Sequence, residues 1–136
     1  MPKMGSPMIS VFIIMSFFIG SIHAWPYIAL VPTYVLINNA IPEAPQLTVH
    51  CRSRDDDLGY HVLSLTDSYD FHFKPNFWGR TLFYCQFNWL NESRYFDIYI
   101  QKRDYSRCSA LCIWWIKSEG PCYGVDPATC VPYPWN

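Results

Sequence analysis

Six cysteines are the residues whose number and spacing suggest the most chemistry. Cys108 and Cys112 lie at a spacing that zinc tolerates. An even number of cysteines in an exported chain instead favours three disulfides, each worth about 2–4 kcal/mol. Six cysteines allow fifteen pairings, and as a first assignment we predict a bridge between Cys108 and Cys130, which flank the last long strand and its tail. We predict disulfides at all six: Cys51, Cys85, Cys108, Cys112, Cys122 and Cys130.

Histidine is the other side chain that could carry catalysis, as a general acid or base. His50, His61 and His72 lie beyond the N-terminal segment, but none has a recognisable catalytic context. A Ser–His–Asp arrangement, a G-x-S-x-G turn and a Gly-rich phosphate loop are all lacking. His50 and His72 fall on the polar side of alternating segments, which predicts that both face solvent. We therefore predict no catalytic residue, no bound metal and no cofactor.

An acidic run, Asp55-Asp56-Asp57, could bind calcium or the basic patch of a partner. Calcium loops usually alternate their acidic ligands as D-x-D-x-D-G. Here the three acids are consecutive and Leu58 precedes Gly59, so their side chains point in different directions. We predict a solvated turn, with a partner contact or a calcium site as the alternatives.

Asn91-Glu92-Ser93 is an N-glycosylation acceptor pattern. It lies in a polar break between two strand-like segments, where a glycosyltransferase has access. We therefore predict a glycan on Asn91.

The first 24 residues have the organisation of a secretory signal peptide. Lys3 is followed by the apolar run from Met8 to Gly20, and the segment ends in a small residue, Ala24. The run is shorter than the roughly 20 apolar residues that span a bilayer. We predict cleavage after Ala24, which leaves residues 25–136 as one secreted domain; an uncleaved anchor is the alternative.

The charge balance of the chain excludes nucleic acid as a partner. The chain has 10 basic and 11 acidic side chains and a net charge of −1, whereas nucleic-acid binding requires a basic face. Aromatic residues make up 18% of the chain, and they favour strands and fill a core efficiently.

Alternating apolar and polar residues recur along the chain, separated by turn residues. Such period-two segments, with a turn every 8–12 residues or so, indicate an all-β sandwich or barrel. Pro75–Gly79 is predicted to be a turn that carries two aromatic residues. Cys51 and Cys85 are in phase with apolar strand faces, so we expect at least one of them to bridge inside the sandwich. The predicted strands are residues 33–38, 46–53, 60–65, 68–74, 81–89, 95–102 and 111–118. We predict an all-β fold, a small disulfide-stapled antiparallel β-sandwich of about seven to eight strands.

The order of several short motifs resembles the plant self-incompatibility S-protein homologue family. The motifs are Leu47-Thr48-Val49-His50-Cys51-Arg52-Ser53, Asp55-Asp56-Asp57-Leu58-Gly59, Phe71-His72-Phe73-Lys74-Pro75-Asn76-Phe77-Trp78-Gly79, Thr81-Leu82-Phe83-Tyr84-Cys85, Phe96-Asp97-Ile98-Tyr99, Cys112-Ile113-Trp114, Gly120-Pro121-Cys122 and Pro134-Trp135-Asn136. Each motif alone is weak, but their order and spacing are specific, and they span residues 33–136.

The resemblance implies a secreted plant β-sandwich without enzymatic activity, acting as a ligand for a cell-surface membrane receptor. It implies recognition through polar loops, which correspond to residues 54–59, 91–94 and 102–109. The candidate partner-binding residues are Arg54, Asp55, Asp56, Asp57, Arg103, Asp104 and Arg107. We expect a monomer that binds no small-molecule substrate. The alternative function is a secreted defence effector, either a hydrolase or a membrane-active toxin.

Overall fold

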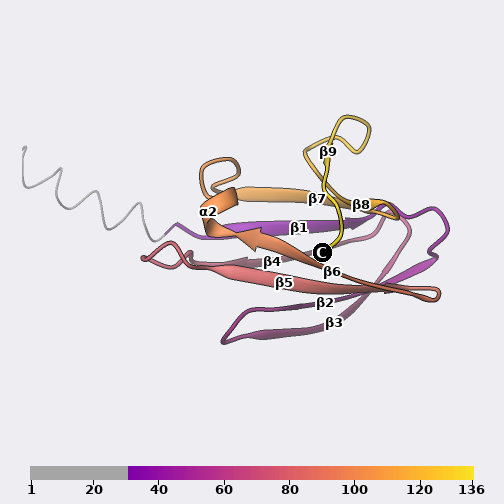
Figure 1. The fold of residues 1–136 in the computed structure, drawn as a ribbon, viewed down its shortest axis with the longest axis horizontal. Coiled ribbons are helices and arrows are strands. Elements are labelled where there is room, and N and C mark those ends of the chain that lie inside the picture. Colours follow the sequence, from indigo (N-terminus) through magenta and orange to yellow (C-terminus); the bar gives the residue numbers. More distant parts are fainter. Residues whose placement is uncertain (1–30) are drawn as a thin grey trace, which may run out of the picture. The chain divides into compact units, whose positions relative to one another are not determined.

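The computed structural model describes residues 31–136, which form two β-sheets (Figure 1). The strands are β1 (Thr33–Asn39), β2 (Gln46–Arg52), β3 (Asp57–Ser64), β4 (Ser68–Phe73), β5 (Leu82–Trp89), β6 (Glu92–Ile100), β7 (Leu111–Lys117), β8 (Gly120–Tyr123) and β9 (Val131–Pro132), with one helical turn, α2 (Gln101–Asp104). The predicted leader and its cleavage site lie outside the described residues. Within residues 31–136, no helix is long and apolar enough to cross a membrane.

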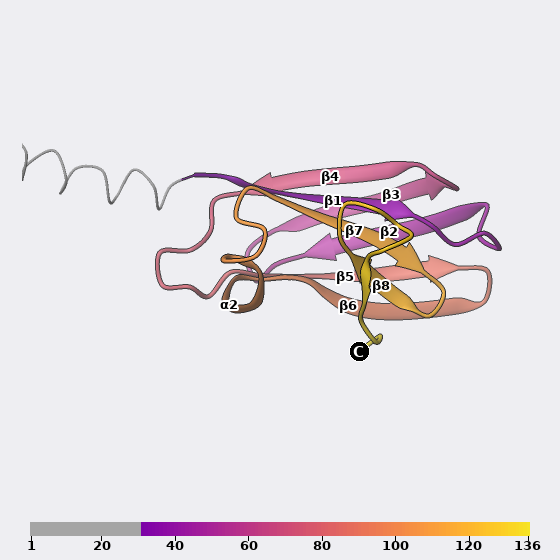
Figure 2. The same ribbon diagram turned by 90° about the horizontal axis from the view of Figure 1, so that it is seen from above.

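The two sheets lie face to face, which confirms the predicted sandwich (Figures 1 and 2). One sheet has the order β3-β2-β5-β6 and is antiparallel throughout. The other has the order β4-β1-β7-β8-β9. Its central pair, β1 and β7, is parallel, so the prediction of antiparallel strands is wrong for this pair. A parallel pair needs a long crossover connection. Here all four strands of the β3-β2-β5-β6 sheet, together with β4, lie between β1 and β7 in the sequence.

All seven strands predicted from alternation are present, and two short ones were missed. β8 and β9 lie in the tail after residue 118, where no strand was predicted, and both contain proline. Proline reduces the strand signal because it lacks the donor that a ladder needs. These strands extend the sheet by pairing β8 with β7 and β9 with β8.

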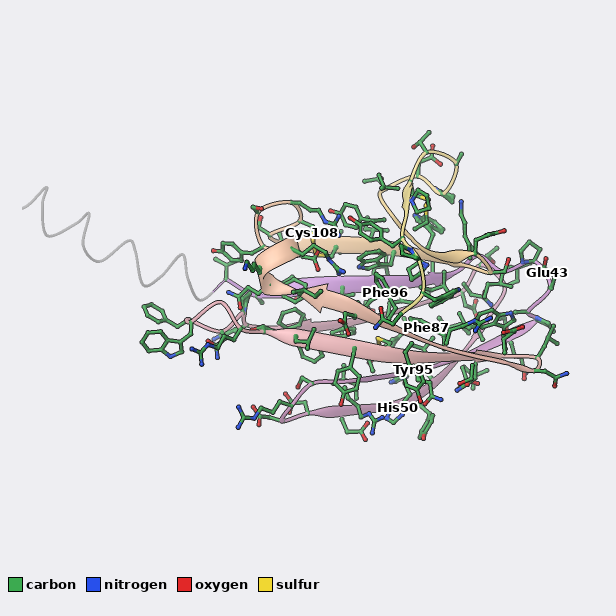
Figure 3. All side chains as sticks on the ribbon, viewed as in Figure 1. Glu43, His50, Phe87, Tyr95, Phe96 and Cys108 are labelled. Carbon is green, nitrogen blue, oxygen red and sulfur yellow. A yellow bond between two sulfur atoms is a disulfide. The ribbon has the colours of Figure 1, made fainter. Side chains whose placement is uncertain are left out.

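Large aromatic side chains fill the space between the sheets. Trp114, in the centre of β7, is fully buried. Its ring centroid lies 5.0 Å from that of Phe96, across the sandwich, and 5.3 Å from that of Tyr123. Figure 3 shows Phe87 and Phe96 directed between the sheets, whereas His50 and Tyr95 lie on the outer face of the β3-β2-β5-β6 sheet. The core therefore depends on both sheets.

All six cysteines form disulfides, but the predicted pairing of Cys108 with Cys130 is wrong. The bridges are Cys51–Cys85, Cys108–Cys112 and Cys122–Cys130. Cys51 and Cys85 lie directly opposite each other on β2 and β5, buried inside the sandwich as expected. The other two bridges close short local loops, a class of pairing that the alternation of strands does not reveal.

Two β-bulges change which side chains face the core. In β6, two residues oppose the single residue Tyr84 of β5, and the extra residue turns Tyr99 inward. Strict alternation along β6 would place Tyr99 on the face opposite Phe96 and Ile98. Tyr99 is instead fully buried, and burial raises its pKa to about 12. In β3, the bulge contains Gly59 at a φ of +77°, a conformation that glycine adopts without strain.

Candidate functional site

Three connecting segments gather at one end of the sandwich, which we call the loop end (Figures 1 and 2). They are the β2–β3 turn (residues 53–56), the β4–β5 loop (residues 74–81) and α2 with the segment that follows it (residues 101–110). The β5–β6 turn lies at the opposite end. Connections on a rigid scaffold are the usual location of binding residues.

Hydrogen bonds fix the shape of the β4–β5 loop. The Asn76 side-chain oxygen accepts from the Trp78 backbone N–H at 2.6 Å, and the Gly79 N–H donates to the Asn76 carbonyl at 3.1 Å. Asparagine at the start of a turn often caps its own backbone in this way. Gly79 has a φ of +75°, which suits glycine at the end of this turn.

Gln101 ties this loop to the first turn of α2. Its side-chain amide donates to the Asn76 carbonyl at 2.9 Å, and its side-chain oxygen accepts from the Thr81 N–H at 3.1 Å. The Thr81 hydroxyl oxygen accepts in turn from the Asn76 N–H at 2.6 Å. The loop is therefore held by its own hydrogen bonds and by those to Gln101 of α2.

The β4–β5 loop has a cleft on each side. The larger, about 580 Å³, lies between this loop and the β2–β3 turn, and its charged lining residues are Arg54, Asp55, Asp56, Lys74 and Arg80. The smaller, about 320 Å³, lies on the α2 side and is lined by Gly79, Gln101, Lys102, Tyr105 and Ser106. The loop end thus presents two concave surfaces around one projecting loop.

The predicted acidic turn contributes two of its three carboxylates to the larger cleft. Asp55 and Asp56 line it together with Arg54. The turn is closed by a hydrogen bond from the Ser53 N–H to the Asp56 carbonyl and one from the Asp56 N–H to the Ser53 hydroxyl. Asp57 lies in β3 rather than in the turn. The described residues contain no group of three potential metal ligands, so the calcium alternative gains no support.

Asp57 pairs with His50, and the prediction that His50 faces solvent is wrong. Only 6% of His50 is exposed, and its Nε2 atom lies 2.6 Å from Oδ1 of Asp57. The Gly59 N–H also donates to Oδ1 of Asp57. The Gly59 hydrogen bond, and then the one from His50, hold the pKa of the Asp57 carboxyl below its usual range.

The three histidines do not converge. The His61 Nε2 atom lies 2.9 Å from the Leu58 carbonyl, and its ring stacks on Tyr69. His72 stacks on Tyr34 of the neighbouring strand β1. The Tyr60 ring covers His50, with the two ring centroids 4.1 Å apart, whereas Asp57 is exposed. The described residues therefore bring one histidine and one carboxylate together without a nucleophile hydrogen-bonded to them.

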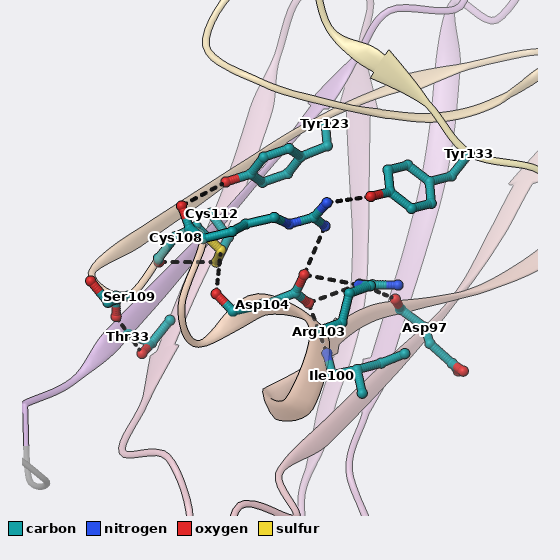
Figure 4. The surroundings of a disulfide bond; sticks show 11 residues. Thr33, Asp97, Ile100, Arg103, Asp104, Cys108, Ser109, Cys112, Tyr123 and Tyr133 are labelled. Atoms are coloured by element: carbon teal, nitrogen blue, oxygen red, sulfur yellow. Dashed lines mark hydrogen bonds and ion pairs between the residues drawn. A yellow bond between two sulfur atoms is a disulfide. The ribbon is translucent and has the colours of Figure 1, made fainter.

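Asp104 is buried, so the prediction that it contacts a partner is wrong. Its carboxylate is fully enclosed and accepts hydrogen bonds from Arg103, from Arg107 and from the Ile100 N–H (Figure 4). Arg107 also donates to the Tyr133 hydroxyl and lies 3.8 Å from the Tyr123 ring centroid. We call Arg103, Asp104 and Arg107 the ionic cluster. It packs beside Cys108–Cys112 and fixes the β6–β7 connection, so the loop end has a rigid base.

Asn91, the predicted glycosylation site, is exposed in the β5–β6 turn, at the end opposite the loop end. The rest of the predicted 91–94 loop, Glu92 to Arg94, is the start of β6, and an ion pair joins Arg94 to Glu92 at 3.0 Å. The structure thus unites two of the three predicted loops and separates the third from them.

Sequence reasoning missed Phe77, Trp78, Lys74 and Arg80. Residues 75–79 were predicted to be a turn with two aromatics and nothing more. The signal that was available is the pair of large aromatic residues between Asn76 and Gly79, where no strand alternation accounts for them. Aromatic residues in a turn without a core face are expected to be exposed.

Comparison with known sequences identifies the family. The sequence profile described as plant self-incompatibility protein S1 matches residues 34–135. The chain belongs to this family. S-protein homolog 5 of Arabidopsis thaliana is 45% identical over 101 residues, covering 74% of this chain and 77% of the relative. S-protein homolog 29 of the same plant is 36% identical over 128 residues, 91% of each chain.

A solved structure of an SPH (self-incompatibility protein homologue) protein has the same fold. It superposes with a TM-score of 0.60 at 18% identity, covering 79% of this chain and 96% of the other. The SPH proteins are described as a widespread family of small, highly stable, secreted proteins from plants. The predicted family and sandwich fold are therefore confirmed, and the chain is a member of a family of secreted plant proteins.

Proposed function

We propose that this S-protein homologue is a secreted, non-catalytic ligand for a cell-surface protein, and that it contacts this protein through the loop end. The observation that carries the proposal is the larger cleft, where Arg54, Asp55 and Asp56 of one loop face Lys74 and Arg80 of another. Charges arranged around a cleft favour the encounter with one partner and disfavour others.

The scaffold supports recognition more than catalysis. The ionic cluster, the Cys108–Cys112 bridge and the Gln101 hydrogen bonds hold the loop end in one conformation. A preorganised surface loses less entropy when it binds. By contrast, an active site needs titratable groups converging on a reacting atom, and His61 and His72 lie on different surfaces from the His50–Asp57 pair.

The predicted glycosylation site lies at the end of the sandwich opposite the loop end, which also supports the proposal. Asn91 is exposed in the β5–β6 turn. A glycan there leaves both clefts of the loop end uncovered. A monomer is sufficient for this role, because both clefts are formed within one chain.

Binding to intact plant cells tests the role. The labelled secreted protein should bind saturably, and treatment of the cells with protease should remove a large part of the binding because the partner is a protein. Binding that complete removal of surface proteins leaves unreduced would contradict the receptor-ligand role.

A membrane-active effector is the second candidate, and the exposed Phe77–Trp78 pair is the observation that favours it. Dye release from vesicles separates the two functions. An effector of this kind permeabilises vesicles in the absence of a protein partner, whereas a ligand leaves their contents in place.

A further inference from the structure

The tip of the β4–β5 loop exposes two adjacent aromatic rings. Phe77 is 78% exposed and Trp78 is 74% exposed. Their ring centroids are 5.3 Å apart and the rings are nearly perpendicular, at 88°. Large aromatic side chains placed together on a polar surface mark a site of contact with another molecule or a membrane.

Hydrogen bonds fix the backbone that carries these two rings. Asn76 accepts from the Trp78 N–H, Gly79 donates to the Asn76 carbonyl, and Gln101 and Thr81 each bind Asn76. None of these hydrogen bonds uses the side chain of Phe77 or Trp78. The fold of the loop therefore leaves both rings exposed, and the loop backbone needs little further ordering when the rings bind.

The charge around the rings is positive, although the whole chain has a net charge of −1. The loop of residues 74–81 contains two basic side chains, Lys74 and Arg80, and no acidic one. The charged residues that line the two clefts are four basic ones, Arg54, Lys74, Arg80 and Lys102, against Asp55 and Asp56. A cationic rim around an aromatic tip complements an anionic surface.

We propose that the β4–β5 loop docks on an anionic phospholipid membrane, with Phe77 and Trp78 in the interfacial layer and Lys74 and Arg80 against the headgroup phosphates. Tryptophan is favoured at this interface because one part of its ring system is apolar and the other donates a hydrogen bond. Basic side chains near the surface add electrostatic attraction, which salt screens.

This lipid contact is an addition to the proposed contact with a cell-surface protein. A ligand held at the membrane meets a membrane-embedded partner at a raised effective concentration. Lipid docking needs no receptor, so it can be tested with lipid vesicles alone. Its failure would leave the proposed contact with a protein unaffected.

Co-sedimentation with vesicles tests the docking. One set of vesicles contains phosphatidylcholine with phosphatidylserine, and the other contains phosphatidylcholine alone. The secreted protein should bind the anionic vesicles more tightly, and binding should weaken as salt is raised. The double variant Phe77→Ser/Trp78→Ser should bind roughly tenfold more weakly or worse, because two apolar side chains no longer leave water.

Three further variants locate the contact, one in the β4–β5 loop and two matched controls elsewhere. Arg80→Gln should weaken binding about fivefold, as expected for one cation near an anionic surface. Arg94→Gln removes one exposed cation at the opposite end and should leave binding unchanged. Val125→Ser removes an exposed apolar side chain from the β8–β9 loop and should also leave binding unchanged. All these side chains are exposed, so the thermal midpoints of the variants should match the wild type.

Several outcomes would overturn the lipid proposal. Absence of binding to anionic vesicles at low salt would do so, as would equal binding by wild type and the Phe77→Ser/Trp78→Ser variant. An equal effect of Arg80→Gln and Arg94→Gln would mean that the attraction is not local to the loop. The wild type could fail to bind vesicles while the Phe77→Ser/Trp78→Ser variant loses protease-sensitive binding to cells. That result would mean that the two rings contact the protein receptor, and only the lipid proposal would fail.

Discussion

The Nε2 atom of His50 lies 2.6 Å from Oδ1 of Asp57, and this contact joins the end of β2 to the first residue of β3. The same carboxylate oxygen accepts from the Gly59 N–H. The pair therefore sets where the β2–β3 turn ends and leaves Arg54, Asp55 and Asp56 as its exposed part.

Acidification should weaken the fold through Asp57. Its pKa is lowered from the ordinary value of 3.8, first by the Gly59 hydrogen bond and then by His50. The folded chain therefore binds this proton less readily than the unfolded chain. The stabilisation is present above pH 3.8 and is lost as the pH falls through the lowered pKa.

Thermal unfolding measured from neutral pH to below pH 3.8 checks this. Asp57→Asn should lose less stability on acidification than the wild type, while Asp55→Asn, in the exposed turn, should follow the wild type. Identical acid profiles for wild type and Asp57→Asn would contradict the assigned role of the pair.

Asp104→Asn should destabilise the protein strongly. The substitution keeps the shape of the side chain but leaves Arg103 and Arg107 without their buried counter-charge. Breaking a buried ion pair from one side typically costs about 3–5 kcal/mol. Urea unfolding measures the change, with Asp70→Asn as the control because Asp70 is exposed on β4. A loss for Asp104→Asn as small as that of the control would mean that the ionic cluster is not structural.

The three disulfides should differ in their contribution to stability. Chain entropy predicts a larger effect for a longer loop, and the bridged cysteines are 34, 8 and 4 residues apart for Cys51–Cys85, Cys122–Cys130 and Cys108–Cys112. Replacing each pair by alanine should lower the free energy of unfolding by about 4, about 2.5 and about 2 kcal/mol, in that order. Denaturant unfolding tests the order, and peptide mapping tests the pairs. A linked Cys108–Cys130 peptide would refute the pairing.

Asn91→Gln should remove a glycan and leave binding intact. In a plant secretory host the variant should migrate faster than the wild type on a denaturing gel. Its binding to cells should be unchanged, because Asn91 lies at the end opposite the loop end. Equal migration of the two proteins would show that the acceptor pattern is not used.

The alternation of apolar and polar residues was sufficient to predict the main strands, because each of these strands has one face in the core. Val35 and Ile37 in β1 and Cys85 and Phe87 in β5 are buried at every second position. The two-residue period no longer predicts which side chains face the core where a bulge adds a residue, as at Tyr99 in β6 and near Gly59 in β3. A bulge depends on how two strands pair, which one strand's sequence does not specify.

Charged residues were harder to place than apolar ones. Arg103, Asp104 and Arg107 were predicted to lie in a polar loop that contacts a partner, and charged side chains are rarely buried without counter-charges. Their burial becomes favourable only when the tail brings Tyr123 and Tyr133 over them. The corresponding prediction for Arg54, Asp55 and Asp56 was correct, since all three are exposed in the β2–β3 turn.

Binding to intact plant cells by variants of the two ends tests the central claim most directly. Asp55→Asn/Asp56→Asn changes the larger cleft at the loop end, and Glu92→Gln/Arg94→Gln removes two exposed charges at the opposite end. Both pairs are exposed, so both variants should fold and be secreted normally. We expect the first variant to change protease-sensitive binding roughly tenfold, with the second binding as the wild type does. Unchanged binding by the loop-end variant, together with lost binding by the opposite-end variant, would contradict the account.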